Sequence, residues 1–229
     1  MKNSVRLSAE ERREAIVEAV KGLFAEKGFD GTTTRELANA AGVSEALLYK
    51  HFPSKESLYA AMLDHCAKGP GLVEYNRILA LVPSTSTLVI MVHFLISHFV
   101  LGSVEHANRE ALNRLAVRSL LEDGAFVRVA HRKFTDAFIE QFEKCLKAAA
   151  KAGELRENPV HRHLRGWFAH HIAFALMLHF HPKLPAVNYR ISKEALVRQA
   201  VWFVLLGAGV KEEAIQLHYN PEAFALLTG

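Results

Sequence analysis

Hydrophobic residues recur along this chain with the spacing of α-helices. Between residues 8 and 27, apolar side chains fall on one face, and Gly28 follows the last of them. No stretch alternates polar and apolar residues over the length of a β-strand, and helix-forming residue types dominate. The pattern predicts an all-α protein, with further helices near residues 54–68, 72–82, 86–101, 104–122, 126–152, 160–180, 192–208, 211–217 and 221–228.

Residues 32–59 contain two short predicted helices joined by a tight turn. Thr33 and Thr34, with Glu36 close behind, signal the start of the first helix, because a threonine hydroxyl can accept from the unpaired N–H groups of the first turn. Gly42 is suited to the left-handed conformation that ends many helices, and Ser44 can cap the next helix. Pro53 prevents simple continuation of that helix. This arrangement is typical of a helix-turn-helix, whose second helix fits a DNA major groove.

The same segment resembles the DNA-binding domain of the tetracycline-repressor (TetR) family of bacterial regulators. The resemblance rests on LxxAAGVSxxLLYxHFPSKExL and on AIVEAVKGLFAEKGFDGTTTREL before it, and it covers about residues 8–68. It implies an N-terminal helix-turn-helix, three-helix DNA-binding domain at residues 1–55. It also implies a larger helical ligand-binding and dimerisation domain at 56–229, with the helix that begins near residue 54 shared between the two.

Candidate DNA-binding residues lie on the second short helix and at the start of the first. Leu48 and Phe52 are expected to point into the core, which leaves the other positions for the groove, the DNA backbone or solvent. The ring of Tyr49 can lie against a thymine methyl, and its hydroxyl can donate to a phosphate. His51 and Lys55 are candidates for phosphate contacts. The full set is Thr33, Thr34, Arg35, Ser44, Glu45, Ala46, Leu47, Tyr49, Lys50, His51 and Lys55.

The resemblance implies backbone contacts for Thr34 and Tyr49, and base contacts for Arg35, Glu45 and Ala46. The side-chain chemistry is compatible with these roles, because arginine can bind guanine through two hydrogen bonds and glutamate can accept one from cytosine. An alternative role for Glu45 is to stabilise the helix dipole, since an acid at a helix start does so whatever it faces.

The charge of the chain changes this picture little. The net charge of +4 and the pI near 9.1 favour a polyanionic partner. Residues 1–55, however, hold nine basic and eight acidic side chains, a net charge of +1. Specificity is therefore expected to depend on Arg35, Tyr49, Lys50 and dimer spacing. One such helix reads few bases, so the predicted partner is double-stranded, pseudo-palindromic operator DNA bound by a homodimer.

Two C-terminal helices, near 160–180 and 192–208, are predicted to form the homodimer. Small residues on the first, Gly166, Ala169 and Ala173, would allow close helix approach, and the second presents Leu196, Ala200, Phe203, Val204 and Gly207. The resemblance implies a four-helix interface built from two helices of each subunit. The alternative is that these stripes fill the core of one subunit.

The middle helices are expected to hold a small, largely apolar effector. Aromatic side chains with a few polar groups suit such a ligand, although each aromatic could equally be plain core. The candidate lining residues are Phe94, His98, Phe99, Phe134, Phe138, Trp167, His171 and Phe174.

Several other functions find less support in the sequence. The paired histidines at 161/163, 170/171 and 179/181 have no His or carboxylate partner four residues away on the same predicted helix, so no metal or cofactor is expected. Cys66 and Cys145 lack a CxxC neighbour, and two thiols fit a reducing cytoplasm. Residues 78–104 carry no charge and could span a bilayer by length, but Pro83 and a polar stripe favour a buried helix.

No signal peptide is expected, because the first twenty residues carry charges throughout. A Gly-rich phosphate loop, a paired-carboxylate motif and a nucleophile elbow are all missing from the sequence, so no enzymatic activity is expected. The predicted protein is a cytoplasmic, ligand-responsive transcription regulator, a repressor released from its operator by the effector. The alternatives are an all-α enzyme, or a metal or redox sensor on the same fold.

Overall fold

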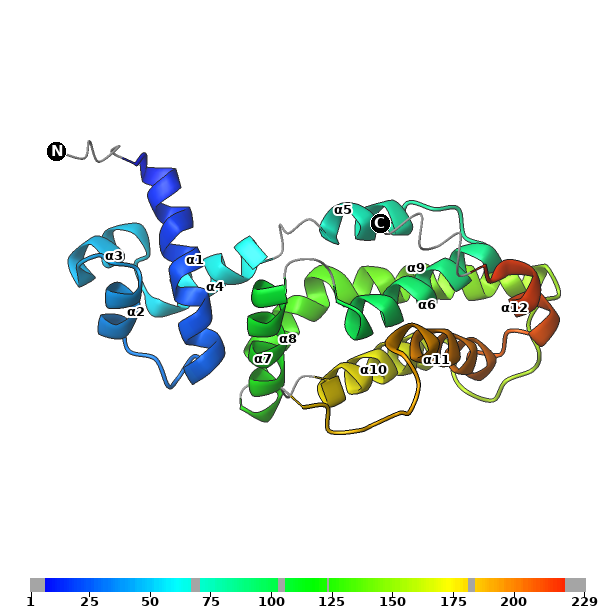
Figure 1. Cartoon of the computed structure of the whole chain (residues 1–229). Helices are drawn as coiled ribbons and strands as arrows, with labels where there is room; N and C mark the ends of the chain where they lie inside the picture. Colours follow the sequence, from blue (N-terminus) through cyan, green and yellow to red (C-terminus); the bar gives the residue numbers. More distant parts are fainter. Residues whose placement is uncertain (1–6, 67–70, 103–105, 123, 181–183, 221–229) are drawn as a thin grey trace. The chain divides into compact units, whose positions relative to one another are not determined.

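The computed structural model describes residues 7–66, 71–102, 106–122, 124–180 and 184–220 (Figure 1). Within these ranges the regular elements are helices, with one isolated bridge between Leu155 and Val210. The predicted all-α class is confirmed, and the predicted short helix at 221–228 lies outside the described residues. The helices are α1 (Ala9–Lys27), α2 (Thr34–Ala40), α3 (Glu45–His51), α4 (Lys55–Cys66), α5 (Gly71–Leu79), α6 (Thr85–Val100), α7 (His106–Leu121), α8 (Ala125–Ala130), the π-helix η1 (His131–Thr135), α9 (Asp136–Lys151), α10 (Arg162–Phe180), α11 (Lys193–Gly207) and α12 (Glu212–His218).

The chain forms two compact units that are not consecutive in sequence. The first comprises residues 1–70 and 107–133, and the second comprises 71–106 and 134–229. The division falls after Pro70, just past α4, the helix that the sequence interpretation shares between the predicted domains 1–55 and 56–229. Helices α7 and α8, expected in the ligand-binding domain, belong by their contacts to the first unit.

The core of the first unit is shared by helices from both of its segments. Val20 and Phe24 of α1 are fully buried in one cluster with Met62 of α4 and Leu115 of α7. The Arg118 side chain of α7 also donates to the Glu26 carbonyl at the end of α1, over 2.5 Å. Helix α7 therefore packs in the same core as α1 and α4 and stabilises the position of α1.

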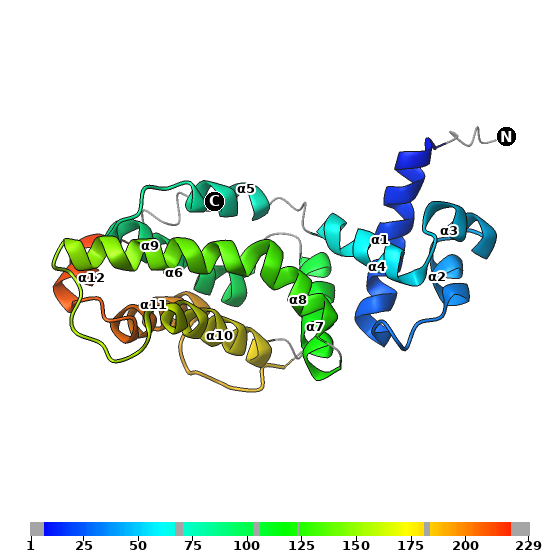
Figure 2. The same ribbon diagram turned by 180° about the vertical axis from the view of Figure 1, so that it is seen from behind.

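The second unit is built around α6. Helices α9, α10 and α11 pack against it, as the two opposite views show (Figures 1 and 2). Leu88, Met91, Val92 and Ile96 of α6 are completely buried, which explains why this helix is uncharged and highly apolar. No described helix combines the length and apolarity that a membrane span needs.

The small residues of α10 face the interior of the subunit. Gly166, Ala169 and Ala173 are buried, and a Cβ at Gly166 would lie 2.9 Å from Cδ1 of Ile139 in α9. This close approach favours the second of the two alternatives for the α10 stripe, in which it packs within one subunit. On α11, Phe203 is instead 67% exposed.

The single helix predicted at 126–152 is interrupted. It consists of α8, the π-helix η1 and α9, and the boundary between the two units falls between Lys133 and Phe134, inside η1. Within the second unit, the Tyr75 hydroxyl of α5 donates to the Phe134 carbonyl and so gives a carbonyl of the π-turn a side-chain partner. The apolar period in the sequence continues across η1, so it did not reveal this change of helix type.

Candidate DNA-binding surface

The turn between α2 and α3 is fixed by local hydrogen bonds. Thr33 and Glu36 form a capping box at the start of α2, and the Ser44 hydroxyl accepts from the Leu47 N–H at the start of α3. Gly42 lies between the helices with φ +64°, a left-handed conformation that glycine adopts without strain. These caps and the glycine are as the sequence predicted, so the geometry of the turn is set largely by its own residues.

Helix α3 has one buried and one exposed side. Leu48 and Phe52 are buried in the core of the first unit, as expected. Most of the candidates lie on the opposite side, and Tyr49 is 45% exposed. The candidates exposed to solvent are Thr33, Arg35, Ser44, Glu45, Ala46, Tyr49 and Lys50, and those that are half-buried are Thr34, Leu47, His51 and Lys55.

The candidates Thr34 and Lys55 also have partners inside the unit. The Thr34 hydroxyl lies 3.4 Å from Oε2 of Glu45 and so joins the starts of α2 and α3. The Lys55 ammonium lies 4.4 Å from the centre of the Phe29 ring. This cation–π contact gives Lys55 a structural role that its sequence context did not predict.

An ion pair ties α2 to α1. The Lys27 ammonium donates to Oε1 of Glu36 over 2.5 Å. This hydrogen bond, together with those from the Thr33 N–H and hydroxyl, lowers the pKa of the Glu36 carboxyl to about 2. Glu36 thus remains charged over the whole physiological range and contributes to the acidic side of the charge balance.

Arg13 of α1 contacts the end of α3, and the sequence pattern did not predict this contact. Its Nη1 donates to the carbonyl of His51, the last residue of α3, over 2.6 Å. Its guanidinium also lies 4.2 Å from the centre of the Phe52 ring. Arg13 and His51 are 38 positions apart, and no motif in the sequence connects them.

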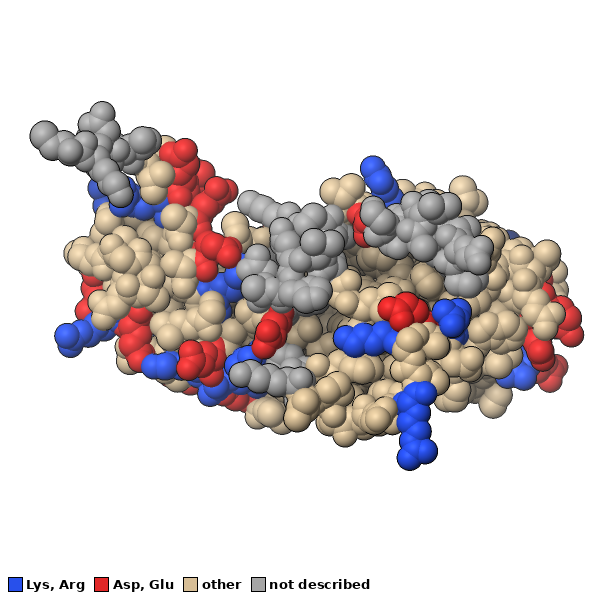
Figure 3. All heavy atoms as spheres, viewed as in Figure 1, with Lys and Arg blue, Asp and Glu red and all other residues tan. Residues whose placement is uncertain are grey.

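The surface charge of this unit is mixed. Side chains of both signs lie on the visible face of the α1–α3 region, with acids grouped along its upper edge and the two signs mixed along its lower edge (Figure 3). The exposed side of α3 itself offers one acid, Glu45, one base, Lys50, and the phenol of Tyr49. The shape and the hydrogen-bonding groups of α3 therefore distinguish this surface more than a strong positive charge does.

In the second unit, most of the predicted effector residues lie close together. The rings of Phe99, Trp167, His171 and Phe174 lie around His170 at centroid distances of 5.6–6.4 Å. His98 packs edge-to-face on Phe99 at the side of this group. His170 was not among the candidates. The cluster lies where α6 packs against α10.

Two of the predicted effector residues lie in other surroundings. The Phe134 ring packs edge-to-face on Tyr75 of α5, and Phe138 is buried beside Phe142 of α9. Phe134 and Phe138 therefore pack against rings other than those around His170, which the sequence did not indicate.

An open groove of about 270 Å³ is lined by different residues: Asp136, Ile139, Glu140, Glu143 and His163. The His163 Nδ1 lies 2.6 Å from Oε1 of Glu143, and the Trp167 indole N–H donates to His163 Nε2. Within the described residues, no group of three His, Cys, Asp or Glu side chains is arranged to hold a metal ion.

The segment with the helix-turn-helix geometry also matches a known family. The model described as "Bacterial regulatory proteins, tetR family" matches residues 16–62, which run from α1 into α4. The chain is a TetR-family protein. The family is described as one of bacterial regulatory proteins, which favours a regulator over the enzyme alternative.

Several curated relatives of this TetR-family chain carry one name, nucleoid occlusion factor SlmA. The protein from Haemophilus ducreyi is 41% identical over 58 residues, which is 25% of this chain and 29% of that protein. The protein from Marinobacter nauticus is 29% identical over 147 residues, 64% of this chain and 70% of that protein. In most of these relatives the match spans less than a third of their length.

Solved structures of the TetR family share the fold over nearly the whole chain. PfmR from Thermus thermophilus is 23% identical with a TM-score of 0.58, covering 84% of this chain and 97% of its own. A TetR-family regulatory protein from Rhodococcus RHA1 is 19% identical with a TM-score of 0.58, covering 88% and 99%. At these identities the likeness concerns the fold alone.

Proposed function

We propose that this TetR-family protein is a ligand-responsive repressor that binds double-stranded operator DNA as a homodimer. The observation that carries the proposal is the two-sided α3. Leu48 and Phe52 fix one side in the core, and Glu45, Ala46, Tyr49 and Lys50 are left exposed on a helix of groove-binding type.

The side chains divide by what they can bind. Arg35 at the start of α2 is exposed and can hydrogen-bond a guanine edge, while Ala46 and Leu47 can contact thymine methyl groups. Tyr49 and Lys50 can bind phosphates and so fix the position of the helix on the duplex. Glu45 can accept from a cytosine amine, although part of its carboxylate is directed to Thr34.

The proposed dimer forms through exposed apolar residues of α10 and α11. Leu164, Phe168 and Leu178 recur along one face of α10, and each is between 37% and 49% exposed. Phe203 of α11 is exposed as well. Buried in a dimer, these side chains would hold two recognition helices at a spacing of about 34–36 Å, one turn of DNA.

The effector is proposed to bind in the second unit, near the aromatic cluster between α6 and α10. A largely apolar molecule suits those rings. The chain passes between the two units three times, at 70/71, 106/107 and 133/134. A shift in the second unit would reach the first through these connections, provided that the effector binds the two states with different affinity.

A gel shift tests the proposal. The purified protein should bind the DNA upstream of its own gene more tightly than a shuffled duplex of equal length, and added salt should weaken binding. Tyr49→Ala should abolish the shift while the far-UV circular dichroism and the dimer are retained. Equal affinity for both duplexes would refute the proposal, and unfolding of the Tyr49→Ala variant would place this side chain in the core.

A further inference from the structure

The backbone hydrogen bonds of α3 end at Phe52. A helix carbonyl accepts from the N–H four residues later, but Pro53 has no N–H to offer the carbonyl of Tyr49. Phe52 has an extended backbone with φ −136°. The last helical hydrogen bond is therefore the one from the Phe52 N–H to the Leu48 carbonyl. With seven residues, α3 is also too short to be stable without partners from outside.

The two ends of α3 are held in different ways. At its start the Ser44 hydroxyl accepts from the Leu47 N–H, a cap within the segment itself. At its end the partner is Arg13 of α1, which donates to the His51 carbonyl and lies over the Phe52 ring. A cation at this position is also favoured by the negative end of the helix dipole.

We infer that Arg13 is the positioning residue of the recognition helix. Arginine fits this role because its planar guanidinium can donate to a carbonyl and stack on an aromatic ring at the same time. Lysine would supply the charge and a single donor without the planar stack. The inference rests on the proposed DNA-binding function, and it assigns Arg13 an effect on sequence discrimination rather than on phosphate attraction.

The contacts of Arg13 with the His51 carbonyl and the Phe52 ring, called the Arg13 clamp below, matter for DNA binding because Lys50 and His51 lie beside them. Both residues lie in the last turn of α3, where phosphate contacts would fix the helix in the groove. When Arg13 is absent, that turn frays and the contacts lose their fixed geometry. Binding to a specific operator then weakens, whereas binding that depends only on net charge does not.

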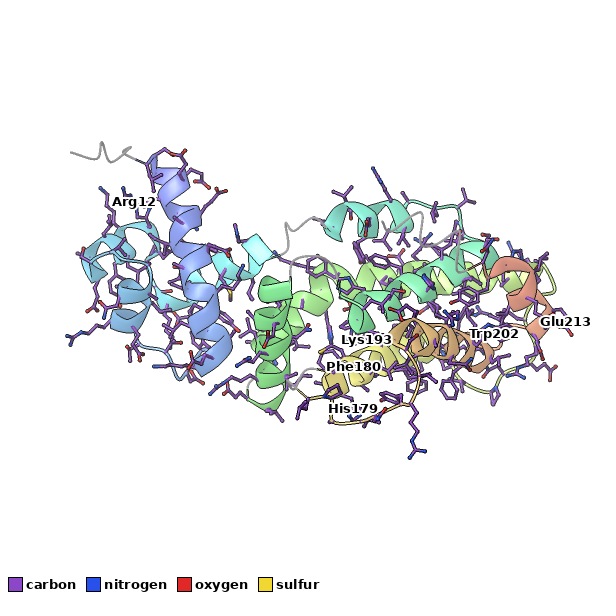
Figure 4. The ribbon with its side chains drawn as sticks, viewed as in Figure 1. Arg12, His179, Phe180, Lys193, Trp202 and Glu213 are labelled. Atoms are coloured by element: carbon purple, nitrogen blue, oxygen red, sulfur yellow. The ribbon has the colours of Figure 1, made fainter. Side chains whose placement is uncertain are left out.

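Two variants and a matched control test the inference. Arg13→Met removes the donor and the charge but keeps most of the apolar stem, and Arg13→Lys restores the charge and one donor. Arg12→Met removes the same charge one position earlier on α1 (Figure 4). The thermal midpoint of each variant confirms that the fold is retained, and Arg13→Lys serves if Arg13→Met does not fold.

The first measurement needs no DNA. Amide hydrogen exchange in the free protein should be faster at residues 48–52 in Arg13→Met than in wild type, with α2 and α4 unchanged. Arg12→Met should leave these amides unchanged. Unaltered exchange at residues 48–52 would overturn the clamp, whether or not the protein binds DNA.

The second measurement compares operator and shuffled DNA over a salt series. Arg13→Met should weaken operator binding by roughly tenfold, the loss expected for one charged hydrogen bond, with the salt slope and the shuffled-DNA affinity retained. Arg13→Lys should fall between the two. Equal loss on both DNAs with a smaller salt slope would make Arg13 a phosphate contact and overturn the inference. If wild type binds neither DNA preferentially, the proposed function fails and the exchange result still decides the clamp.

Discussion

Truncation of Leu115 on α7 would show whether residues 107–133 belong to the DNA-binding unit. Leu115 is 2% exposed and lies in the buried cluster that contains Phe24 of α1 and Met62 of α4. Replacing a buried leucine by alanine typically costs about 3 kcal/mol, from lost burial and the cavity left behind. A change of this size raises the population of the opened unit by roughly a hundredfold.

The consequence of Leu115→Ala should be confined to one unit. Hydrogen exchange followed by mass spectrometry should find faster exchange in peptides from α1 and α4, with α9 and α11 close to wild type. Leu146→Ala is the matched control, since Leu146 is fully buried in the core of the second unit and should give the reverse pattern. Faster exchange only in α9 and α11 on Leu115→Ala would refute the grouping of α7 with α1 and α4.

Three further predictions follow from individual contacts. Ser44→Ala removes the cap of α3 and should lower the free energy of unfolding by about 1 kcal/mol, measured by urea titration; an unchanged midpoint would mean that the cap contributes nothing. Phe203→Asp should convert the dimer to a monomer in light scattering, because it places a charge on the proposed interface; a persistent dimer would locate the interface elsewhere. The Thr85 hydroxyl, followed by His218, holds the pKa of the Glu154 carboxyl below its ordinary value. A depressed carboxyl pKa stabilises the fold above the unfolded pKa of about 4.3, and this stabilisation is lost as the pH falls through the folded pKa. Glu154→Gln should therefore be less stable than wild type at neutral pH and converge with it in acid, as followed by thermal melts; a constant difference at every pH would contradict this assignment.

The helix-turn-helix was predictable because its signals are local. Thr33, Gly42, Ser44 and Pro53 each act on backbone groups within a few residues, and the structure has the first three in the predicted roles. The direction of Leu48 follows from helical spacing in the same way. Such features depend on nothing outside the segment, so the sequence pattern is sufficient to place them.

Other features depend on partners far away in the sequence. The role of Arg13 requires His51, and the place of Leu115 requires α1 and α4. The partner of the small residues on α10 is also distant in the sequence. A row of small side chains predicts close helix packing but does not identify the helix that packs against it. Ile139 of α9 turns out to be that neighbour for Gly166.

The neighbours of the aromatic residues also could not be predicted from local sequence patterns. Residue type alone groups Phe134 with Phe94 and Phe174, yet the Phe134 ring packs against Tyr75 of α5. Phe134 lies within the π-helix η1, where the extra residue per turn changes the direction of the side chains, and an apolar period of three or four residues does not encode that change. Membership of a pocket is a tertiary property, and only the packing of α5, α6, α9 and α10 defines it.

Selection from a pool of random duplexes tests whether α3 reads DNA in a two-fold dimer. Bound duplexes recovered over several rounds should converge on a motif with two-fold symmetry, whose half-sites are centred about 10–10.5 base pairs, or a multiple, apart. The Tyr49→Ala variant, carried in parallel, should enrich nothing. Failure of the wild-type protein to enrich any motif, or enrichment of a single unrepeated site, would contradict the account.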